Sequence, residues 1–333
     1  MDALPASVRR SAEEHGFSGV VRVDRPGEAP YAEAFGLAER AIGVPNTVDT
    51  RFGIASGTKT LTAVTVLSLV ADGLLALDTR ARALLRDDLP EIDDRVTVEQ
   101  LLAHRSGIGD YIDEDTDLDS TDYLLDLPVH RFVDTEDYLP ALAGFPPKFP
   151  PGSGFSYCNS GYVVLALLAQ RAAGRPFDAL VEERVCRPGG LERTSFIRSD
   201  ELPADAARGY LAEGGLRTNV LHLPVRGSGD GGVYTTVADV HRVWQALLSG
   251  GLVPQELVAE MRRARGRELD EGRRYGFGLW LDPDSDALMM EGMDAGVSFF
   301  SEHRPSSGRT WTVIANTGDG AWPMVRHLAG PMT

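Results

Sequence analysis

The chain contains almost no lysine. Of its 33 cationic side chains, only Lys59 and Lys148 are lysines, and all the others are arginines. Arginine keeps its proton in proteins, whereas a lysine can lose one when it is desolvated or lies near another cation. Lys59 stands three residues after a serine, in Ser56-Gly57-Thr58-Lys59. Because a neutral lysine amine can accept the proton of a serine hydroxyl, this spacing predicts a nucleophilic Ser56 with Lys59 as its base.

Other features are also scarce, and each scarcity excludes a class of protein. Two cysteines, Cys158 and Cys186, make no disulfide framework and favour a reduced, cytoplasmic protein. No apolar run approaches the roughly 20 residues that a bilayer requires, and residues 1–5 do not read as the start of a signal peptide. The net charge of -16 argues against nucleic acid or a membrane as a partner. His, Cys, Asp and Glu show no metal-type spacing, so we expect neither a metal nor a cofactor.

The Ser-x-x-Lys motif is more specific here than in an average chain. Two lysines and 19 serines in 333 residues give roughly 0.1 chance occurrences of it. The alternative is a solvated lysine on a helix beside an N-cap serine. An apolar stretch, 52–55, precedes Ser56, and apolar residues at helical spacing follow it. We therefore expect Ser56 in the first turn of a buried helix over 57–76, where the positive helix end favours developing negative charge.

Strand-like segments lie at both ends of the chain, and helix-like segments lie between them. The predicted strands are 17–23, 31–36, 275–281, 286–291, 296–301 and 309–316. The predicted helices, besides 57–76, are 97–104, 136–143, 160–173, 177–186, 236–249 and 322–329. This order predicts an α+β fold: one antiparallel sheet built from both chain ends, flanked by helices, with a mostly helical inserted domain. Residues 1–58 and 233–333 would form the sheet domain and residues 59–232 the helical domain, with the active site at their junction.

Residues 110–137 are rich in acidic side chains, among them Asp110, Asp113 and Glu114. One interpretation is a solvated surface loop. The other is an acidic rim over a cleft, which would repel anionic substrates. The sequence leaves both interpretations open.

A tyrosine and an asparagine follow a turn rich in proline and glycine, as Tyr157-Cys158-Asn159. A tyrosine phenol near a lysine ammonium has its anion stabilised and can pass protons, which makes Tyr157 the candidate relay. Asn159 can donate to a substrate carbonyl and accept from an N–H group. The pair alone is a weak motif, and an ordinary turn tyrosine is the alternative.

Taken in order, these motifs resemble those of the serine β-lactamase and penicillin-binding protein superfamily, in its branch of class C β-lactamase-related serine hydrolases. The resemblance covers nearly the whole chain. It rests on Ser56-x-x-Lys59, on Leu101 to Ile108, which is similar to the family's LLtHtSGl pattern, on Tyr157-x-Asn159, on Gly231 to Val240 and on Tyr275 to Trp280. It implies a β-lactamase/transpeptidase-like fold and a catalytic set of Ser56, Lys59 and Tyr157.

The third motif of that family, K-T-G or H-x-G on a strand beside the site, is altered here. The preferred register places Met290, Glu291 and Gly292 at its three positions. A second register, Asp294-Ala295-Gly296, breaks the downstream spacing. Neither register has the lysine or histidine that helps to hold a substrate carboxylate, and Glu291 or Asp294 would repel one. Ordinary strand core is the alternative for the methionine at 290.

The resemblance also implies roles for residues around this motif. In the preferred register, the backbone N–H groups of Ser56 and Met293 form the oxyanion hole. The residues expected to contact the substrate are Asn159, Met290, Glu291, Gly292 and Asp294. His104 invites a triad with Ser56, but by resemblance it is a structural histidine before a turn. Cys158 is expected to be a small buried residue.

These residues together predict a serine hydrolase that acts through an acyl-enzyme on an ester or amide of a small molecule. A carboxylesterase is favoured, because the missing cation, the acidic segment and the absent signal peptide all count against anionic cell-wall substrates. The alternatives are a β-lactamase, a D-amino-acid peptidase or amidase, an acyltransferase of the same fold, and a non-catalytic binding homologue. The sequence names neither the acyl group, nor the leaving group, nor the oligomeric state.

Overall fold

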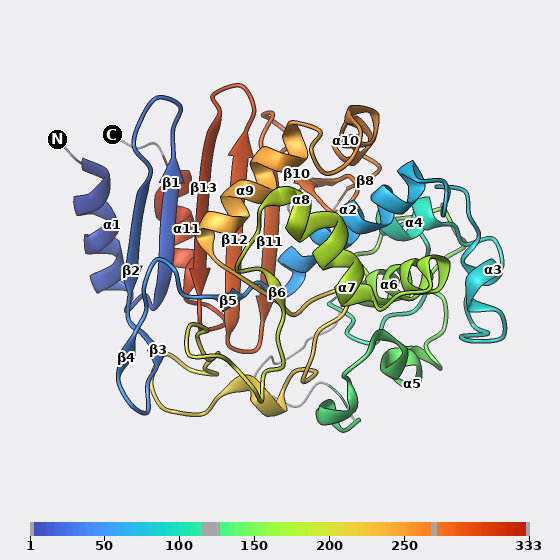
Figure 1. Ribbon diagram of the computed structural model, residues 1–333, viewed down its shortest axis with the longest axis horizontal. Helices are drawn as coiled ribbons and strands as arrows, with labels where there is room; N and C mark the ends of the chain where they lie inside the picture. The colour runs from blue at the N-terminus through green and yellow to red at the C-terminus, as the bar shows by residue number, and fades with distance from the viewer. Residues whose placement is uncertain (1–2, 115–124, 126, 268–271, 331–333) are drawn as a thin grey trace.

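The computed structural model describes residues 3–114, 125, 127–267 and 272–330 (Figure 1). Within these residues the helices are α1 (Ala3–Glu14), α2 (Thr58–Ala71), α3 (Ala81–Leu85), α4 (Val98–Leu102), α5 (Leu139–Leu142), α6 (Asn159–Ala173), α7 (Phe177–Val181), α8 (Arg187–Gly189), α9 (Val237–Leu248), α10 (Gln255–Met261) and α11 (Ala321–Ala329). The strands are β1 (Gly19–Asp24), β2 (Tyr31–Phe35), β3 (Leu37–Glu39), β4 (Val44–Pro45), β5 (Phe52–Gly53), β6 (Ser195–Phe196), β7 (Val233–Thr235), β8 (Gly266–Arg267), β9 (Arg274–Tyr275), β10 (Trp280–Leu281), β11 (Leu288–Asp294), β12 (Val297–Arg304) and β13 (Arg309–Ala315).

An eight-stranded sheet joins the two ends of the chain. Its strand order is β2-β1-β13-β12-β11-β10-β9-β8, and all of its neighbouring strands pair antiparallel. The N-terminal strand β1 lies beside the C-terminal β13 in the middle of the left half of Figure 1. The predicted α+β class, with an antiparallel sheet built from both chain ends, is therefore confirmed.

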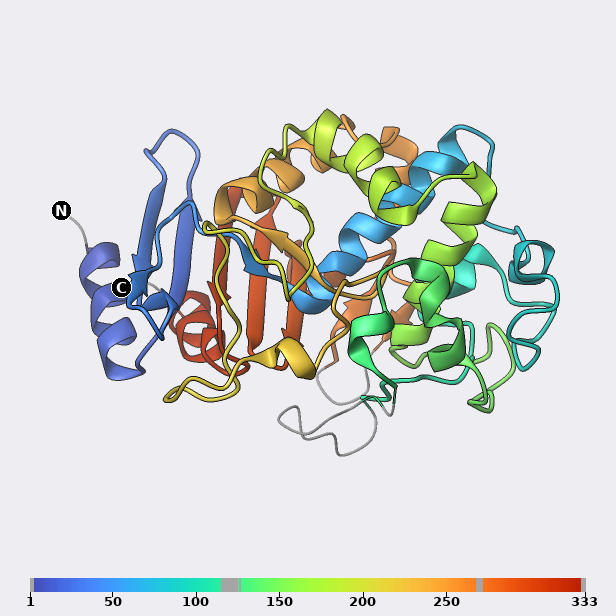
Figure 2. The ribbon, with the colours of Figure 1, turned by 60° about the horizontal axis from the view of Figure 1, so that its bottom comes forward.

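Helices cover both faces of this sheet because successive side chains of a strand point to opposite faces. On β13, Trp311 and Val313 pack in one apolar cluster with residues of α1 and α11. Ile314, which follows Val313, points to the opposite face and packs in the other cluster, with residues of α2, α6 and α9. Figure 2 shows the same arrangement, with α11 beneath the sheet and α9 above it. The final helix, predicted over 322–329, is α11.

Helix α2 is buried on every side. Residues 58–69 are all buried, which confirms the predicted buried helix, although it spans Thr58–Ala71 rather than 57–76. The polar residues of the helix are accommodated by hydrogen bonds, as buried polar groups require. Thr60 Oγ1 donates to Gly278 O at 2.5 Å and Thr62 Oγ1 donates to Gly229 O at 2.6 Å. Thr58 Oγ1 accepts from Val233 N at 3.1 Å. The helix thus bonds to segments that lie far from it in the sequence.

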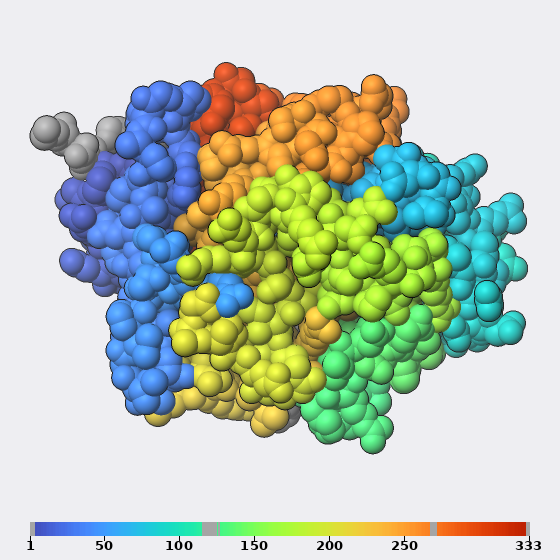
Figure 3. Space-filling view, viewed as in Figure 1, coloured from blue at the N-terminus to red at the C-terminus, as the bar shows by residue number. Residues whose placement is uncertain are grey.

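The helical part of the chain packs around α6, which contacts α2, α3 and α4. The helix predicted over 177–186 runs from α7 through a wider π-turn, Glu182–Cys186, into α8. The long segment between α8 and β7 crosses the front of the molecule in Figure 3, where it covers part of the sheet. The division into domains 1–58 plus 233–333 and 59–232 stays a prediction.

Two expectations about elements need correction. The single strand predicted over 275–281 is a hairpin of two short strands, β9 and β10, in which Trp280 pairs with Tyr275. Gly278 has a positive φ of 68°, which permits the tight turn between them. The predicted helix over 97–104 is shorter: α4 begins after its N-cap Thr97 and ends at Leu102, before His104 with φ 55°. Helix α1 was not predicted from the sequence.

Candidate functional site

Ser56 lies in a 3₁₀ turn, Ala55–Gly57, that leads directly into α2. Ala55 before it has a φ of 43°, a left-handed conformation that a residue with a side chain rarely adopts. Such strain persists where the surrounding structure enforces it, and it is common at active sites. Here the turn is pressed against β11. A Cβ atom added to Gly292 would lie 2.2 Å from Ile54 O and 2.7 Å from Ser56 N. Only a glycine allows this approach.

Lys59 points at Ser56 from one turn further along. Its Nζ donates to Ser56 Oγ at 2.8 Å, to Asn159 Oδ1 at 2.7 Å and to the Asp230 carbonyl at 2.9 Å. The residue is only 1% exposed. Burial lowers its pKa, while the negative charges of nearby carboxylates, Asp230 first, partly oppose that effect. Its direct partners are all uncharged oxygens, so the ammonium form is held without an adjoining counter-ion.

Tyr157 lies beside this lysine, whose Nζ is 4.9 Å from the centre of the phenol ring. Burial raises the pKa of Tyr157 well above its usual value, the negative charge of Glu114 adds to the rise, and a hydrogen bond with Ser56 partly offsets it. The sequence led us to expect a phenol whose anion is stabilised by Lys59. The structure instead keeps Tyr157 protonated at neutral pH, because the cost of burying a phenolate exceeds that stabilisation.

His104 holds the backbone on both sides of Tyr157. The carbonyl of His104 accepts from Ser156 N at 3.1 Å, and its Nδ1 accepts from Cys158 N at 3.0 Å. The imidazole lies against the Tyr157 ring, with 4.3 Å between ring centres. Burial lowers the pKa of His104 well below its usual value, and the charge of Lys59 lowers it further. The histidine is therefore neutral, and its contacts suit a positioning residue.

Asn159 opens α6, and a buried carboxylate caps this helix. Asp110 accepts from Asn159 N at 2.7 Å and from Ser160 N at 2.8 Å, which satisfies two otherwise unpaired N–H groups. Burial raises the pKa of Asp110 to about 6 despite these bonds. The side chain of Asn159 is also engaged, since its Nδ2 donates to Ile112 O at 2.9 Å and to Glu114 at 3.0 Å. Its role in substrate binding stays a prediction.

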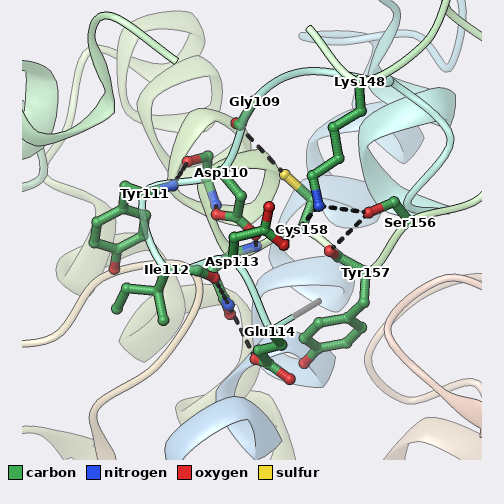
Figure 4. A network of polar contacts seen from close by, with 12 residues as sticks. Gly109, Asp110, Tyr111, Ile112, Asp113, Glu114, Lys148, Ser156, Tyr157 and Cys158 are labelled. Atoms are coloured by element: carbon green, nitrogen blue, oxygen red, sulfur yellow. Dashed lines mark hydrogen bonds and ion pairs between the residues drawn. The ribbon is translucent and has the colours of Figure 1, made fainter. Parts of the chain in front are cut away.

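The acidic segment is not a uniform rim, as Figure 4 shows. Asp110 points inward to α6, whereas Asp113 pairs with Lys148 at 2.7 Å. Glu114 lies beside Tyr157 and accepts from Asn159. Residues 115–124 and 126 lie outside the described residues, so the rim interpretation is not tested there. Lys148 also donates to Ser156 Oγ at 3.0 Å, which places both lysines of the chain at this site.

The altered third motif lies on β11. Gly292 is the residue that meets Ser56, Met290 is 3% exposed among core residues, and Met293 is 52% exposed. Asp294 ends β11, and Gly296 lies in the turn before β12 with a φ of 71°. This geometry supports the preferred register, in which Ser56 and Met293 supply the oxyanion hole. That assignment stays a prediction.

A cation is nevertheless present beside this motif. Arg273 forms an ion pair with Glu291, and its guanidinium lies 4.5 Å from the centre of the Trp280 ring. Trp280 in turn stacks on Tyr157, with ring centres 5.7 Å apart and 11° between the planes. We expected no cation here because the motif itself contains none. The sequence offers no local signal for Arg273, which reaches Glu291 only through the pairing of β9, β10 and β11.

A cavity of about 70 Å³ is lined in part by Ala55, the residue before Ser56. Its walls are mostly apolar or aromatic, and two carboxylates, Asp230 and Asp294, line it. Tyr111 donates to Asp230 at 2.5 Å. Burial raises the pKa of Asp230 and raises that of Asp294 to about 7, and the charge of Asp230 contributes to the second shift. The cavity is large enough for part of a small substrate, and two acidic side chains face it.

Two other kinds of feature are absent from the residues that the structure describes. No group of three or more His, Cys, Asp or Glu side chains in that part of the chain is arranged to hold a metal ion. None of the helices there is long and apolar enough to cross a bilayer.

Comparisons with known proteins give similarity along the whole chain. The Beta-lactamase family model matches residues 4–327. Esterase EstB of Burkholderia gladioli is 31% identical, over 83% of this chain and 77% of the esterase. A D-aminopeptidase of Brucella anthropi is 32% identical, over 84% of this chain but only 52% of that protein. Among solved structures, a penicillin-binding protein from Bacillus halodurans has a TM-score of 0.90 and 33% identity, and the match covers 96% of this chain and 98% of the other.

Proposed function

The chain belongs to the Beta-lactamase family of serine hydrolases, and from that premise we propose that it is a carboxylesterase whose nucleophile is Ser56. The observation that carries this proposal is the 2.8 Å hydrogen bond between Lys59 Nζ and Ser56 Oγ, made by a lysine that is 1% exposed. Burial favours the neutral amine, which can accept the serine proton. The similarity to an esterase supports the substrate class.

The proposed reaction has two halves. Ser56 Oγ attacks the ester carbonyl while its proton passes to Lys59, and the backbone N–H groups of Ser56 and Met293 stabilise the oxyanion. The C–O bond to the leaving alcohol then breaks, and Tyr157, as a neutral phenol, gives its proton to the alkoxide and regains one from Lys59. A water molecule attacks the acyl-enzyme in the same way and releases the acid and free Ser56.

Covalent labelling tests this assignment most directly. A fluorophosphonate probe should label Ser56, as found by peptide mass, and the label should be lost in Ser56→Ala. Ser68→Ala is the matched control, since Ser68 lies on the same helix, is buried, and donates only to Thr65 O. Labelling of Ser56→Ala at the wild-type level would show that another residue is the nucleophile, and a wild-type protein that takes up no label would favour a non-catalytic homologue.

One observation favours a second candidate, an amidase or peptidase for substrates that carry an ammonium group. Asp230 and Asp294 line the cavity that Ala55, the neighbour of Ser56, also lines, and carboxylates attract cations. The similarity to a D-aminopeptidase agrees with this reading. A screen of p-nitrophenyl esters, D-amino-acid amides and nitrocefin separates the two candidates from a β-lactamase, and added alcohols as acceptors would reveal acyl transfer. The substrate is in each case a small molecule.

The cytoplasmic location also remains a prediction. Cys158 and Cys186 are both buried and unbridged, which agrees with the reducing, cytoplasmic location that we propose. Cell fractionation tests it. The oligomeric state needs a measurement of mass in solution.

A further inference from the structure

Lys148 is the second of the two lysines in the chain, and the reaction described above gives it no role. It lies in a bend that precedes Tyr157 in the sequence, and its backbone N–H donates to Gly107 O at 2.8 Å. Its side chain is only 21% exposed. All the other cations of the chain except Lys59 are arginines, so a lysine at this place calls for a physical reason.

The ammonium group of Lys148 links two segments that flank the site (Figure 4). Its bonds include the ion pair with Asp113 Oδ1 at 2.7 Å and the hydrogen bond to Ser156 Oγ at 3.0 Å. Asp113 directly precedes Glu114, which lies beside Tyr157. Ser156 directly precedes Tyr157 itself. Because an ammonium has its donors on one atom, it can hold oxygens of two segments at a single point, whereas a guanidinium spreads its donors over a plane.

The relay segment, residues 154–158, belongs to neither a helix nor a strand. It therefore lacks the repeated backbone hydrogen bonds of regular structure, and individual contacts fix its position. His104 holds its backbone at Ser156 and Cys158, and Lys148 holds the side chain of Ser156. A proton donor must lie within hydrogen-bond reach of the leaving group, and a misplacement of about 1 Å can cost on the order of 100-fold in rate.

We propose that Lys148 is a positioning residue of the proton relay: it links Asp113 to Ser156 and thereby holds the Tyr157 hydroxyl where it can protonate the leaving group. This inference rests on the proposed function. Lys148 acts through its two partners and not on the substrate, so its loss should weaken proton transfer to the leaving group more than it weakens substrate binding.

The test compares two esters with the same acyl group, ethyl butanoate and p-nitrophenyl butanoate. Only the ethoxide leaving group needs a proton, so the ratio of kcat/KM for the ethyl ester to kcat/KM for the nitrophenyl ester reports on the relay. We expect Lys148→Met, which keeps an unbranched side chain without the charge, to lower this ratio about tenfold. Ser156→Ala breaks the same link at its other end and should also lower the ratio.

Two further comparisons separate positioning from a general loss of stability. In a Tyr157→Phe background, Lys148→Met should leave the ratio unchanged, because the group through which Lys148 acts is already missing. Arg22→Met is the matched control, since Arg22 is a cation of similar exposure, 18%, that is paired with Asp24 on β1. The proposal is overturned by an unchanged ratio in Lys148→Met, or in Ser156→Ala where Lys148→Met does not fold. A fall that persists in the Tyr157→Phe background, or that Arg22→Met reproduces, also overturns it.

Hydrogen exchange keeps this test apart from the test of the proposed function, because it requires no turnover. The amide hydrogens of the relay segment should exchange about tenfold faster in Lys148→Met than in wild type, and Arg22→Met should leave their exchange unchanged. If Ser56 proves unreactive but the exchange responds as expected, the proposed reaction fails and the link made by Lys148 stands. If esters are hydrolysed but the relay segment of Lys148→Met exchanges at the wild-type rate, the positioning role fails alone.

Discussion

The start of α2 and the end of β11 meet at Ser56, yet they hold their cations in opposite ways. Lys59 on α2 has three neutral oxygens as its direct partners, whereas Arg273 beside β11 is paired with a carboxylate. A buried cation without an adjoining counter-ion loses its proton more easily, and a guanidinium paired with a carboxylate keeps its charge. The first arrangement suits proton transfer, and the second suits a fixed charge.

The largest effect on turnover is expected when the nucleophile beside Lys59 is removed. Ser56→Ala should lower ester turnover by at least about 10³-fold without unfolding the protein, since the oxyanion hole and binding alone leave little rate. Turnover of a p-nitrophenyl ester and the thermal unfolding midpoint, measured together, check this. A folded variant with more than a few per cent of wild-type turnover would show that another group is the nucleophile.

The second largest effect on turnover is expected when Lys59 is replaced by another cation. Lys59→Arg should be nearly as damaging as Lys59→Ala, because arginine keeps the charge but cannot take up a proton at working pH. The comparison is of kcat in the two variants, with Ser68→Ala as the folding control on the same helix. Near-normal kcat in Lys59→Arg would mean that a fixed positive charge suffices for catalysis. Lys59 and Arg273 would then not differ in the way described above.

Loss of the proton relay at Tyr157 is expected to lower kcat somewhat less. Tyr157→Phe should lower kcat by roughly 10²–10⁴-fold, the usual range for a positioned proton donor. The loss should be smaller for esters of acidic phenols, whose leaving groups need no proton. An equal loss for alkyl and nitrophenyl esters would make Tyr157 a packing residue.

Because His104 holds the backbone beside Tyr157, replacing His104 should cause a further, smaller loss of kcat. His104→Ala removes the acceptor for Cys158 N and should cost about tenfold in kcat with little change in KM, because a displaced Tyr157 transfers its proton poorly. His104→Asn should recover part of this loss, since asparagine tolerates the positive φ at this position and retains an acceptor. Equal losses in both variants would argue for packing alone.

The smallest effect is a shift in pH dependence. Asp230 is the largest of the charges that raise the pKa of Lys59, so Asp230→Asn should lower that pKa further. Lys59 must be deprotonated to act as a base, so kcat/KM falls as the pH drops through its pKa. The acidic limb of the profile should therefore move to lower pH in the variant. A limb that moves to higher pH, or stays in place, would assign it to another group.

The sequence predicted the residues whose relationship is local or belongs to a recognisable motif. Ser56 and Lys59 are one helical turn apart, and the resemblance strengthened the weak Tyr157-x-Asn159 motif; the structure brings all four residues together. The α+β class followed from the order of strand-like and helix-like segments. These inferences succeeded because short-range spacing and motif order are both visible in a single chain.

The missed features depend on contacts between distant segments. Asp110 caps a helix that begins 49 residues later, and the Asp230 carbonyl meets Lys59 across 171 residues. Arg273 reaches Glu291 only after three strands have paired. No local propensity records such contacts. The strand over 275–281 was mispredicted for a different reason, since the positive φ of Gly278 turns this segment into a hairpin.

The burial and hydrogen bonding of helix α2 affect how the protein unfolds. Its threonines are bonded to segments around residues 229, 233 and 278, and its residues 58–69 are covered on every side. Such a helix cannot fray on its own, because each turn that opens would leave buried polar groups unpaired elsewhere. Its amide hydrogens should therefore exchange with solvent only through global unfolding. We therefore expect Ser56 to keep its position on this helix until the protein unfolds globally.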